Sequence, residues 1–520
     1  MKQLKQVGLP MASILLICFY PCAFMFFQNA GEARAVDMLP FFGIFLATAA
    51  GMFLLADVVL RNVARAAVLA DLGVLAVIHF TLICNGIKRL LPGFHNLIFL
   101  GLVGLLLLGL LLLFWRKKPN MTAVCGLLSL VFAALTAVNL FLALPTLIAA
   151  ATYHRPEAAL DRQLPQMRFS GEKRNVYYMI FDEYGGSENL KHYFDYDNEP
   201  FLEELEARGF SVSRSSRNRE SCWTVTLVPN LLNLDYVVTD DIPINNRLEW
   251  MDDPALYRMF RQNGYQVNLV NQNGFLGETG CHLLSKPQHD ETISDYLYAN
   301  SIFCQIPKLK WVIEAQVLHR GQEGPMESLE DVCQAMENSW TQARNRPTLT
   351  VGYFVTPHAP FLFDETGAML PKERQNDWTD PSLYLAKLQY TNDMILRTVH
   401  HIQQEDPDAA ILLLADHGAR TPGHLVNQYG GPWFDTEAEI PYMESVLCCA
   451  YVPGGDIDVE GDNGINAQRK VLRTLFDVEL PPLPEPKDYT IPPEYMPPPP
   501  EKDGHREPPR RPGPKEGSHG

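Results

Sequence analysis

Two short segments of the chain place acidic residues directly after apolar runs. Asp416-His417-Gly418 follows the apolar run 411–415, and Asp182-Glu183 follows the β-rich run 175–181. Runs of this kind are typical of buried strands, and the carboxyl ends of parallel strands meet at one edge of a sheet. Two unpaired acids there repel each other unless a cation neutralises them. Together the pairs favour a divalent metal site, although each pair alone also fits a turn with a capped or solvated acid.

A hydroxyl-bearing segment, residues 221–233, leads into an apolar stretch. A hydroxyl at the start of a helix and held on a metal can be activated as an alkoxide without a neighbouring histidine. Thr224 is the candidate nucleophile of this segment. Taken by itself, Thr224 is also typical of a helix N-cap.

A histidine lies between two prolines in the segment Thr356-Pro357-His358-Ala359-Pro360-Phe361, directly after the expected strand 348–355. Proline restricts its own backbone and that of the residue before it, so the imidazole of His358 is presented from a stiff loop. At the same sheet edge as the acids it becomes a site candidate. The alternative is a loop histidine that is merely exposed.

Strands and helices are expected to alternate after the first acidic pair. A helix with Pro200 in its first turn and Gly209 at its end follows the first strand, and residues 385–402 have apolar side chains at helical spacing. The other expected strands are residues 210–214, 265–270, 348–355 and 410–415. This alternation predicts a layered α/β domain.

The first 151 residues hold five apolar stretches, each about long enough to cross a hydrocarbon core of roughly 30 Å as a helix. They are residues 8–27, 39–60, 66–84, 97–115 and 121–151. A cleavable signal peptide would account for the first stretch and not for five in succession. We therefore expect five transmembrane helices.

Basic residues in the loops predict the orientation of a multi-pass protein in the cell membrane. With the N-terminus in the cytoplasm, the inner side carries more Lys and Arg than the outer side. The inner residues are Lys2, Lys5, Arg61, Arg65, Arg116, Lys117 and Lys118, and the outer ones are Arg34, Lys88 and Arg89. An odd number of crossings then places everything after Ala151 outside the cytoplasm. The less favoured alternative is the opposite orientation, with a cytosolic domain.

Composition separates the later part of the chain from the apolar part. The net charge of -17 comes from the later residues, where no basic stripe appears, and this argues against nucleic acid as a partner. The ten cysteines show no zinc-ribbon spacing. Cys448 and Cys449 are adjacent in an expected strand and should point to opposite faces. Disulfide pairing stays open.

These patterns divide the chain into four parts. The expected parts are a transmembrane anchor, 1–151, a polar linker, 152–172, an extracytoplasmic catalytic domain, 173–479, and a proline-rich tail, 480–520. The tail has 14 prolines and almost no aliphatic residues, so it is expected to be extended and solvated. A wall-spanning or partner-binding role is the alternative.

The ordered set of acids, hydroxyl and histidines resembles the alkaline phosphatase and sulfatase superfamily. The similarity is to its membrane-anchored branch, which includes lipoteichoic acid synthases and phosphoethanolamine transferases, and it covers the anchor and residues 175–453. It implies a five-helix transmembrane domain followed by an alkaline-phosphatase-like α/β sandwich with a central mixed, mostly parallel sheet.

The resemblance also implies roles for single residues. The metal ligands would be Asp182, Thr224, Asp416 and His417, with Glu183 a further candidate. Thr224 and His358 would be catalytic, and the candidate substrate-binding residues are His358, His424 and Arg420. Thr224 is preferred to Thr226 because Pro229 follows it by five residues, similar to the spacing in the phosphoethanolamine transferases.

Two departures from the superfamily bear on the chemistry. Cys222 is followed by Trp-Thr-Val and not by the C-x-P-S-R context that formylglycine formation needs, so sulfate ester hydrolysis is disfavoured. The first metal segment reads Asp-Glu-Tyr-Gly where the membrane-anchored branch usually has Glu. One divalent ion is expected, with Mn, Zn, Mg and Ca left undistinguished.

The sequence therefore predicts a membrane-anchored, metal-dependent transferase that acts on phosphate esters. It would take a head group from a membrane lipid through a covalent phosphothreonine and pass it to an envelope glycan or lipid. Two alternatives stay open. One is a phosphodiester or sulfate ester hydrolase of the same superfamily, and the other is a non-catalytic envelope scaffold.

Overall fold

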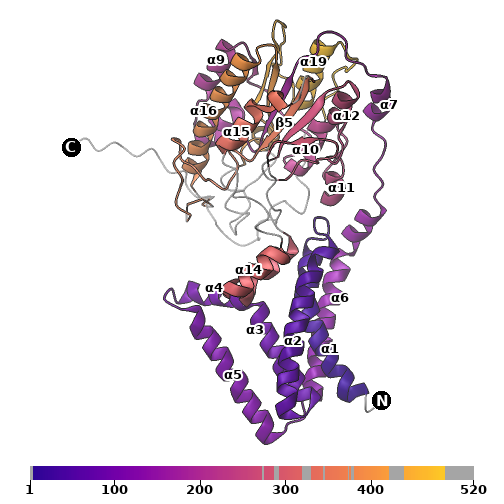
Figure 1. Ribbon diagram of the computed structural model, residues 1–520, viewed down its shortest axis with the longest axis vertical. Helices are drawn as coiled ribbons and strands as arrows, with labels where there is room; N and C mark the ends of the chain where they lie inside the picture. The colour runs from indigo at the N-terminus through magenta and orange to yellow at the C-terminus, as the bar shows by residue number, and fades with distance from the viewer. Residues whose placement is uncertain are drawn as a thin grey trace, which may run out of the picture.

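The computed structural model describes residues 4–271, 274–285, 292–318, 329–342, 346–372, 374–375, 377, 380–420 and 439–486. Its chain forms an N-terminal helical bundle and a layered α/β domain (Figure 1).

Apolar helices build the bundle. Four helices of the described chain are long and apolar enough to cross a membrane, namely α1 (Leu9–Gln28), α2 (Leu39–Leu60), α5 (Asn96–Lys117) and α6 (Thr122–Thr152). A fifth crossing is available only if the pair α3 (Val63–Ile78) and α4 (Phe80–Leu90) forms one span.

The expected third span, residues 66–84, is not one straight helix. α3 and α4 are bent by 64° at the break between them, and α4 lies across the end of the bundle (Figure 1). α4 continues through Asn85, Lys88 and Arg89. These side chains are costly in hydrocarbon, so a helix that turns aside before them keeps them at the boundary with water.

The α/β domain is built on one sheet. In the described residues seven strands follow the order β2-β7-β6-β1-β5-β3-β4, and β7 alone runs antiparallel to its neighbours. The strands are β1 (Val176–Phe181), β2 (Ser211–Ser213), β3 (Gln266–Asn271), β4 (His282–Leu283), β5 (Thr348–Phe354), β6 (Ala410–Ala415) and β7 (Cys448–Tyr451). The mixed, mostly parallel sheet is as predicted, and the two-residue β4 is an addition.

Helices cover both faces of this sheet (Figure 1). One face carries α10 (Thr224–Asn233), α12 (Ala255–Gln262) and α19 (Gly464–Phe476), and the other carries α9 (Glu199–Ala207), α15 (Leu329–Glu337) and α16 (Pro381–Glu405). Alternate residues of β1 supply the two cores: Tyr178 and Ile180 enter the first, and Tyr177 and Met179 enter the second.

The cysteines of β7 follow the same alternation. Cys448 belongs to the first core and Cys449 to the second, as expected for neighbours in a strand. No disulfide joins the ten cysteines, which all lie in the described part of the chain.

The segment 152–172 is more than the polar linker that its sequence indicates. It contains α7 (Ala159–Gln163) and a 3-10 helix (Leu164–Gln166), and it buries Leu160, Leu164 and Met167 in the first core. The predicted tail, 480–520, lies outside the described residues from 487 onward. At its start Leu480 is buried in the same core.

The segment between β4 and α15, called here the α13–α14 excursion, joins the α/β domain to the bundle. It contains α13 (Ile293–Asn300), the 3-10 helix η4 (Ile302–Gln305) and α14 (Pro307–Gln316). Tyr298 and Phe303 pack against Phe41 and Phe45 of α2, with ring centroids 6.2 Å and 6.5 Å apart. The two parts of the chain therefore share an apolar contact.

A buried lysine on α16 holds the loop that follows β5. Nζ of Lys387 donates to the carbonyl oxygens of Val355, His358 and Pro360 at 2.9, 2.5 and 3.1 Å, and its residue is 4% exposed. Burial lowers the pKa of Lys387 to about 7, and the nearby acids oppose that shift. Three carbonyls match the three protons of an ammonium group, so Lys387 fixes the backbone on both sides of His358.

Replacement of Lys387 by methionine should destabilise the protein by at least ~3 kcal/mol, because three buried carbonyls lose a charged donor. Thermal unfolding of the full chain in detergent measures this. Lys191→Met is the control, since that lysine is 66% exposed and forms a surface ion pair with Asp195, four residues along the chain. Equal melting temperatures for the two variants would contradict a fixing role for Lys387.

Candidate functional site

Three adjacent parallel strands bring the acidic segments to one place. Phe181, the last residue of β1, is in register with Phe354 of β5 and Ala415 of β6. Asp182 and Asp416 are the next residues along β1 and β6. They therefore lie side by side at the carboxyl edge of the sheet, where ligands of open α/β sheets bind.

Asp182, Asp416 and His417 form a compact group of potential metal ligands. One ligand atom of each lies within 4.8 Å of the others, and the residues are 6%, 0% and 1% exposed. His417 Nε2 is 3.7 Å from both Asp182 Oδ1 and Asp416 Oδ2. Those two carboxylate oxygens are buried and have no hydrogen-bond partner among the described residues. Such acceptor atoms around one point fit a divalent cation.

The electrostatics of the group agree with that fit. Burial raises the pKa of Asp182 and raises the pKa of Asp416 to about 6, while burial and Arg420 lower the pKa of His417 to about 4. His417 Nδ1 lies 2.9 Å from the carbonyl oxygen of Gly418, to which it can only donate, so Nε2 presents its lone pair to the carboxylates. A cation would supply the charge that this neutral imidazole does not.

Gly418 is required by close packing of the chain after His417. A Cβ atom at this position would lie 2.4 Å from the carbonyl oxygen of Ser445 and 2.8 Å from Asn189 Nδ2. Only glycine allows the chain after His417 to approach these groups so closely.

Thr224 is the first residue of α10, and its side chain faces the ligand group. Thr224 Oγ1 lies 3.2 Å from His417 Nε2. The N-cap of α10 is Trp223, so Thr224 does not take the capping position that was its alternative.

Thr226 has a different environment. It is fully buried, and Oγ1 donates to Asp240 Oδ1 at 2.5 Å and accepts from Arg247 Nη1 at 3.0 Å. Ser221 also donates to Asp240. Thr226 is therefore part of a buried hydrogen-bond network at the start of α10. Thr224 is the hydroxyl that faces the ligand group.

Glu183 turns away from the ligand group, and among the described residues it is not part of it. Its backbone is left-handed, with φ of 63°. Oε1 accepts from the Arg420 backbone N–H at 3.0 Å, and Oε2 lies 3.8 Å from His358 Nε2. Burial alone would raise the pKa of Glu183, but His358, Arg420 and His417 together lower it. The carboxylate therefore faces the cationic side of the site.

His358 and Arg420 lie at the mouth of the same edge. The backbone N–H of His358 donates to the Asp182 carbonyl at 3.3 Å, and its side chain is 26% exposed. The Arg420 guanidinium stacks on Trp223, 4.7 Å from the ring centroid. The structure thus brings all predicted site residues together except His424, which lies outside the described residues.

Three groups near the site were not predicted. Tyr384 donates from its hydroxyl to the Glu183 carbonyl at 2.8 Å, and Lys387 holds the His358 loop. Arg247 pairs with Asp240 at 3.3 Å. Of these three groups, only Lys387 had a signal in the sequence, because it is a lysine between apolar positions of a helix face.

A cavity of about 1150 Å³ extends from the bundle to the start of α10. Its lining residues come from the turn after α1, from the outer half of α6 and from the Asp240–Leu248 segment, and it reaches Trp223 and Val225 on either side of Thr224. The cavity therefore lies beside the segment that carries the candidate nucleophile.

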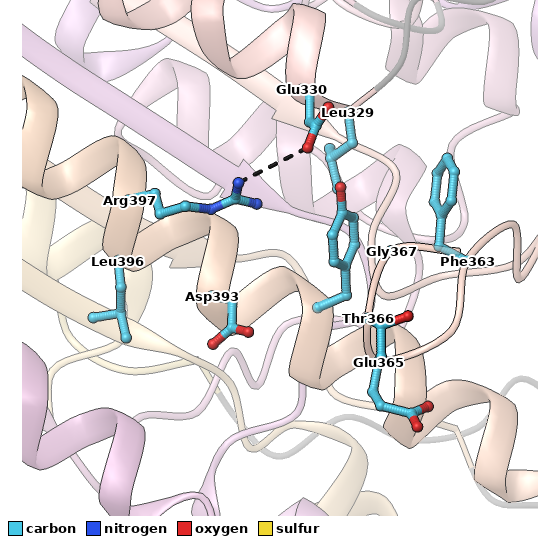
Figure 2. A pocket seen from close by; sticks show the side chains of 10 residues that line it. Leu329, Glu330, Phe363, Glu365, Thr366, Gly367, Asp393, Leu396 and Arg397 are labelled. Atoms are coloured by element: carbon cyan, nitrogen blue, oxygen red, sulfur yellow. Dashed lines mark ion pairs between the residues drawn. The ribbon is translucent and has the colours of Figure 1, made fainter. Parts of the chain in front are cut away.

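A separate pocket of about 500 Å³ lies between α15, α16 and residues 363–367 (Figure 2). Arg397 and Glu330 face each other across it at 3.8 Å. It contains none of the site residues and lies outside the chemistry described above.

Comparison with known proteins gives a family and several structural likenesses. The sulfatase family matches residues 174–443, and no curated protein matches the chain. The integral membrane lipooligosaccharide phosphoethanolamine transferase A of Neisseria meningitidis is 12% identical over 90% of this chain and 96% of its own, with a TM-score of 0.38.

Two further structures are similar to a smaller share of the chain. Lipoteichoic acid synthase LtaP of Listeria monocytogenes is 14% identical over 58% of this chain and 73% of its own, with a TM-score of 0.36. The C-terminal periplasmic domain of EcEptC from Escherichia coli, in complex with zinc, is 10% identical over 60% and 84%, with a TM-score of 0.37.

The family match covers more than half of the 520 residues and contains the acidic pairs, Thr224 and His358. The chain therefore belongs to the sulfatase family, and it is an enzyme that acts on phosphate or sulfate esters.

Proposed function

We propose that this protein is a membrane-anchored phosphoryl transferase that uses Thr224 to take a phosphorylated head group from a membrane lipid. The observation that carries the proposal is the position of Thr224 Oγ1, at the start of α10 and 3.2 Å from His417 Nε2 within the buried ligand group. An alcohol is a weak nucleophile at neutral pH unless its proton is withdrawn.

Asp182, Asp416, His417 and Thr224 are the residues that would hold one divalent metal ion. When bound, such an ion lowers the pKa of a ligated hydroxyl and polarises a phosphoryl oxygen. Four ligands of this kind suit several metals, and the site chemistry does not select one.

In the first step Thr224 Oγ1, which has given its proton to solvent, forms a bond to phosphorus, and the bond from phosphorus to the diacylglycerol oxygen breaks. That oxygen takes a proton, for which His358 is the candidate donor at the mouth of the site. In the second step the hydroxyl of an envelope glycan or lipid forms a bond to phosphorus, the Thr224 oxygen leaves as the alkoxide it was before, and the acceptor proton passes to His358. Glu183 Oε2 lies 3.8 Å from His358 Nε2 and would help to orient the imidazole ring for both proton transfers.

The bundle supports a lipid as donor. The cavity between α1, α6 and the start of α10 would admit a head group from the membrane surface to Thr224. With the N-terminus in the cytoplasm the site faces the outside, where an envelope acceptor is available. The threonine at the nucleophile position favours phosphate over sulfate esters, because the formylglycine route needs a cysteine or serine there.

The covalent intermediate is the sharpest test of the proposal. Full-length protein in detergent, incubated with head-group-labelled phospholipid and quenched in acid, should give a peptide modified on Thr224 by mass spectrometry. The Thr224→Ala variant should show no modification and at least ~10³-fold less transfer, while Thr239→Ala, an exposed threonine outside the ligand group, should behave as wild type. Modification of Thr226 in place of Thr224 would contradict the assignment.

Replacement of His358 by glutamine should slow formation of the intermediate by about 10²-fold or more, because the leaving oxygen loses its proton donor. The burst phase of intermediate formation measures this step. Metal content should not change, since His358 is not in the ligand group. His400→Gln, on the exposed side of α16, is the control. An unchanged burst in His358→Gln would remove His358 from the chemistry.

A further inference from the structure

Helix α4 lies across the end of the bundle (Figure 1), where it contacts the start of η4. Thr81 of α4 donates to the carbonyl oxygen of Ser301, just before η4, at 3.0 Å. α4 exposes Leu82 and Leu90, 57% and 83% accessible, and ends with Lys88 and Arg89. A short helix that exposes both apolar and basic side chains is typical of the membrane–water boundary.

A cavity of about 480 Å³ opens between α4, the start of α5 and η4. Its walls are of two kinds. Lys88, Asn96 and Gln305 form a polar end, and most of the remaining lining is apolar, including Phe80, Leu97 and Leu100. It shares no lining residue with the cavity that reaches Thr224.

The polar end has free capacity for a ligand. Within the described part of the chain no carboxylate lies within 4.0 Å of Lys88 Nζ, although the lysine is only partly exposed. Asn96 Nδ2 donates to Gln305 Oε1 at 3.4 Å, while Asn96 Oδ1 is buried and has no hydrogen-bond partner in the described chain. An ammonium group beside an open acceptor suits an anionic phosphate that carries a hydroxyl or amine donor.

The apolar end continues along the outside of α5. Leu97 and Leu100 are 67% and 43% exposed, and only 6% of the apolar window of α5 is buried within the protein. In a bilayer these faces contact acyl chains. The cavity therefore has a cationic end at the boundary with water and an open apolar end in the membrane.

We propose that this cavity binds a phospholipid that is not the substrate, with its phosphate on Lys88 and an acyl chain along Leu97 and Leu100. The bound lipid fills the angle between α4 and α5. The inference rests on the membrane placement in the proposed function and does not depend on transfer at Thr224.

Lipid retention by the full-length Thr224→Ala protein tests this site without turnover. Delipidated protein in detergent is titrated with dioleoylphosphatidylglycerol, and bound lipids are counted by native mass spectrometry. Lys88→Ala should weaken one binding event about tenfold. Arg89→Ala, with the same charge change on a neighbouring exposed residue outside the cavity, should weaken it less than threefold. Leu100→Trp, which fills the apolar end without changing charge, should also remove this event.

Dioleoylglycerol carries only the apolar half of the ligand, and inorganic phosphate only its anionic half. Neither compound should displace the phospholipid when it is added at the concentration at which the phospholipid saturates the site. Equal retention in Lys88→Ala and Arg89→Ala would overturn the proposal. Competition by inorganic phosphate alone would also overturn it, because it would indicate a soluble anion site. Lipid retention without any modification of Thr224 in the wild type would leave this site standing and refute the transferase.

Discussion

The repulsion between two buried carboxylates is the constraint on which the rest of the site depends. Asp182 and Asp416 lie one residue beyond the ends of neighbouring strands, and the register of β1 and β6 places them side by side. Without a cation their burial raises both pKa values. A sheet that places two acids in this way is stable in the ionised form only with a positive charge between them.

The surrounding residues maintain that geometry. Gly418 lets the chain after His417 pass close to Ser445, and Lys387 fixes the loop of His358. Glu183, held in a left-handed conformation by Arg420 and Tyr384, directs its carboxylate toward His358. One acid of the first pair thus belongs to the ligand group, and the other faces His358 and Arg420.

Much of this arrangement was predictable from the sequence, for physical reasons. β1 and β6 are continuous apolar runs because both of their faces are buried, and their ends mark Asp182 and Asp416 directly. The opposite facing of Cys448 and Cys449 followed from the period of a strand. The family match, residues 174–443, includes β1, β6 and the acids that follow them, and it ends before Cys448.

Other features depend on contacts between distant segments, which no local pattern reveals. A hydropathy window measures length and composition, so it merged α3 and α4 and did not detect the bend at His79. Leu160 and Leu164 have helical spacing, but two apolar residues are too few to mark the segment 152–172 as part of the core. The Glu183 carboxylate points away from the ligand group because it accepts a hydrogen bond from the backbone N–H of Arg420, more than two hundred residues away in the chain.

The membrane and the site are linked by structure as well as by sequence order. The α13–α14 excursion packs on α2, and the larger cavity leads from α1 and α6 to α10. The helix that bears Thr224 is therefore adjacent to the membrane-facing part of the molecule. A lipid head group is the substrate that this placement favours.

The position of a bound metal tests the central claim most directly. Anomalous diffraction from crystals of the full-length protein grown with manganese or zinc should show one peak within about 2.5 Å of ligand atoms of Asp182, Asp416 and His417, and of Thr224 Oγ1. A site without a peak at full metal concentration, or a peak ligated by other residues and remote from Thr224, would contradict the account.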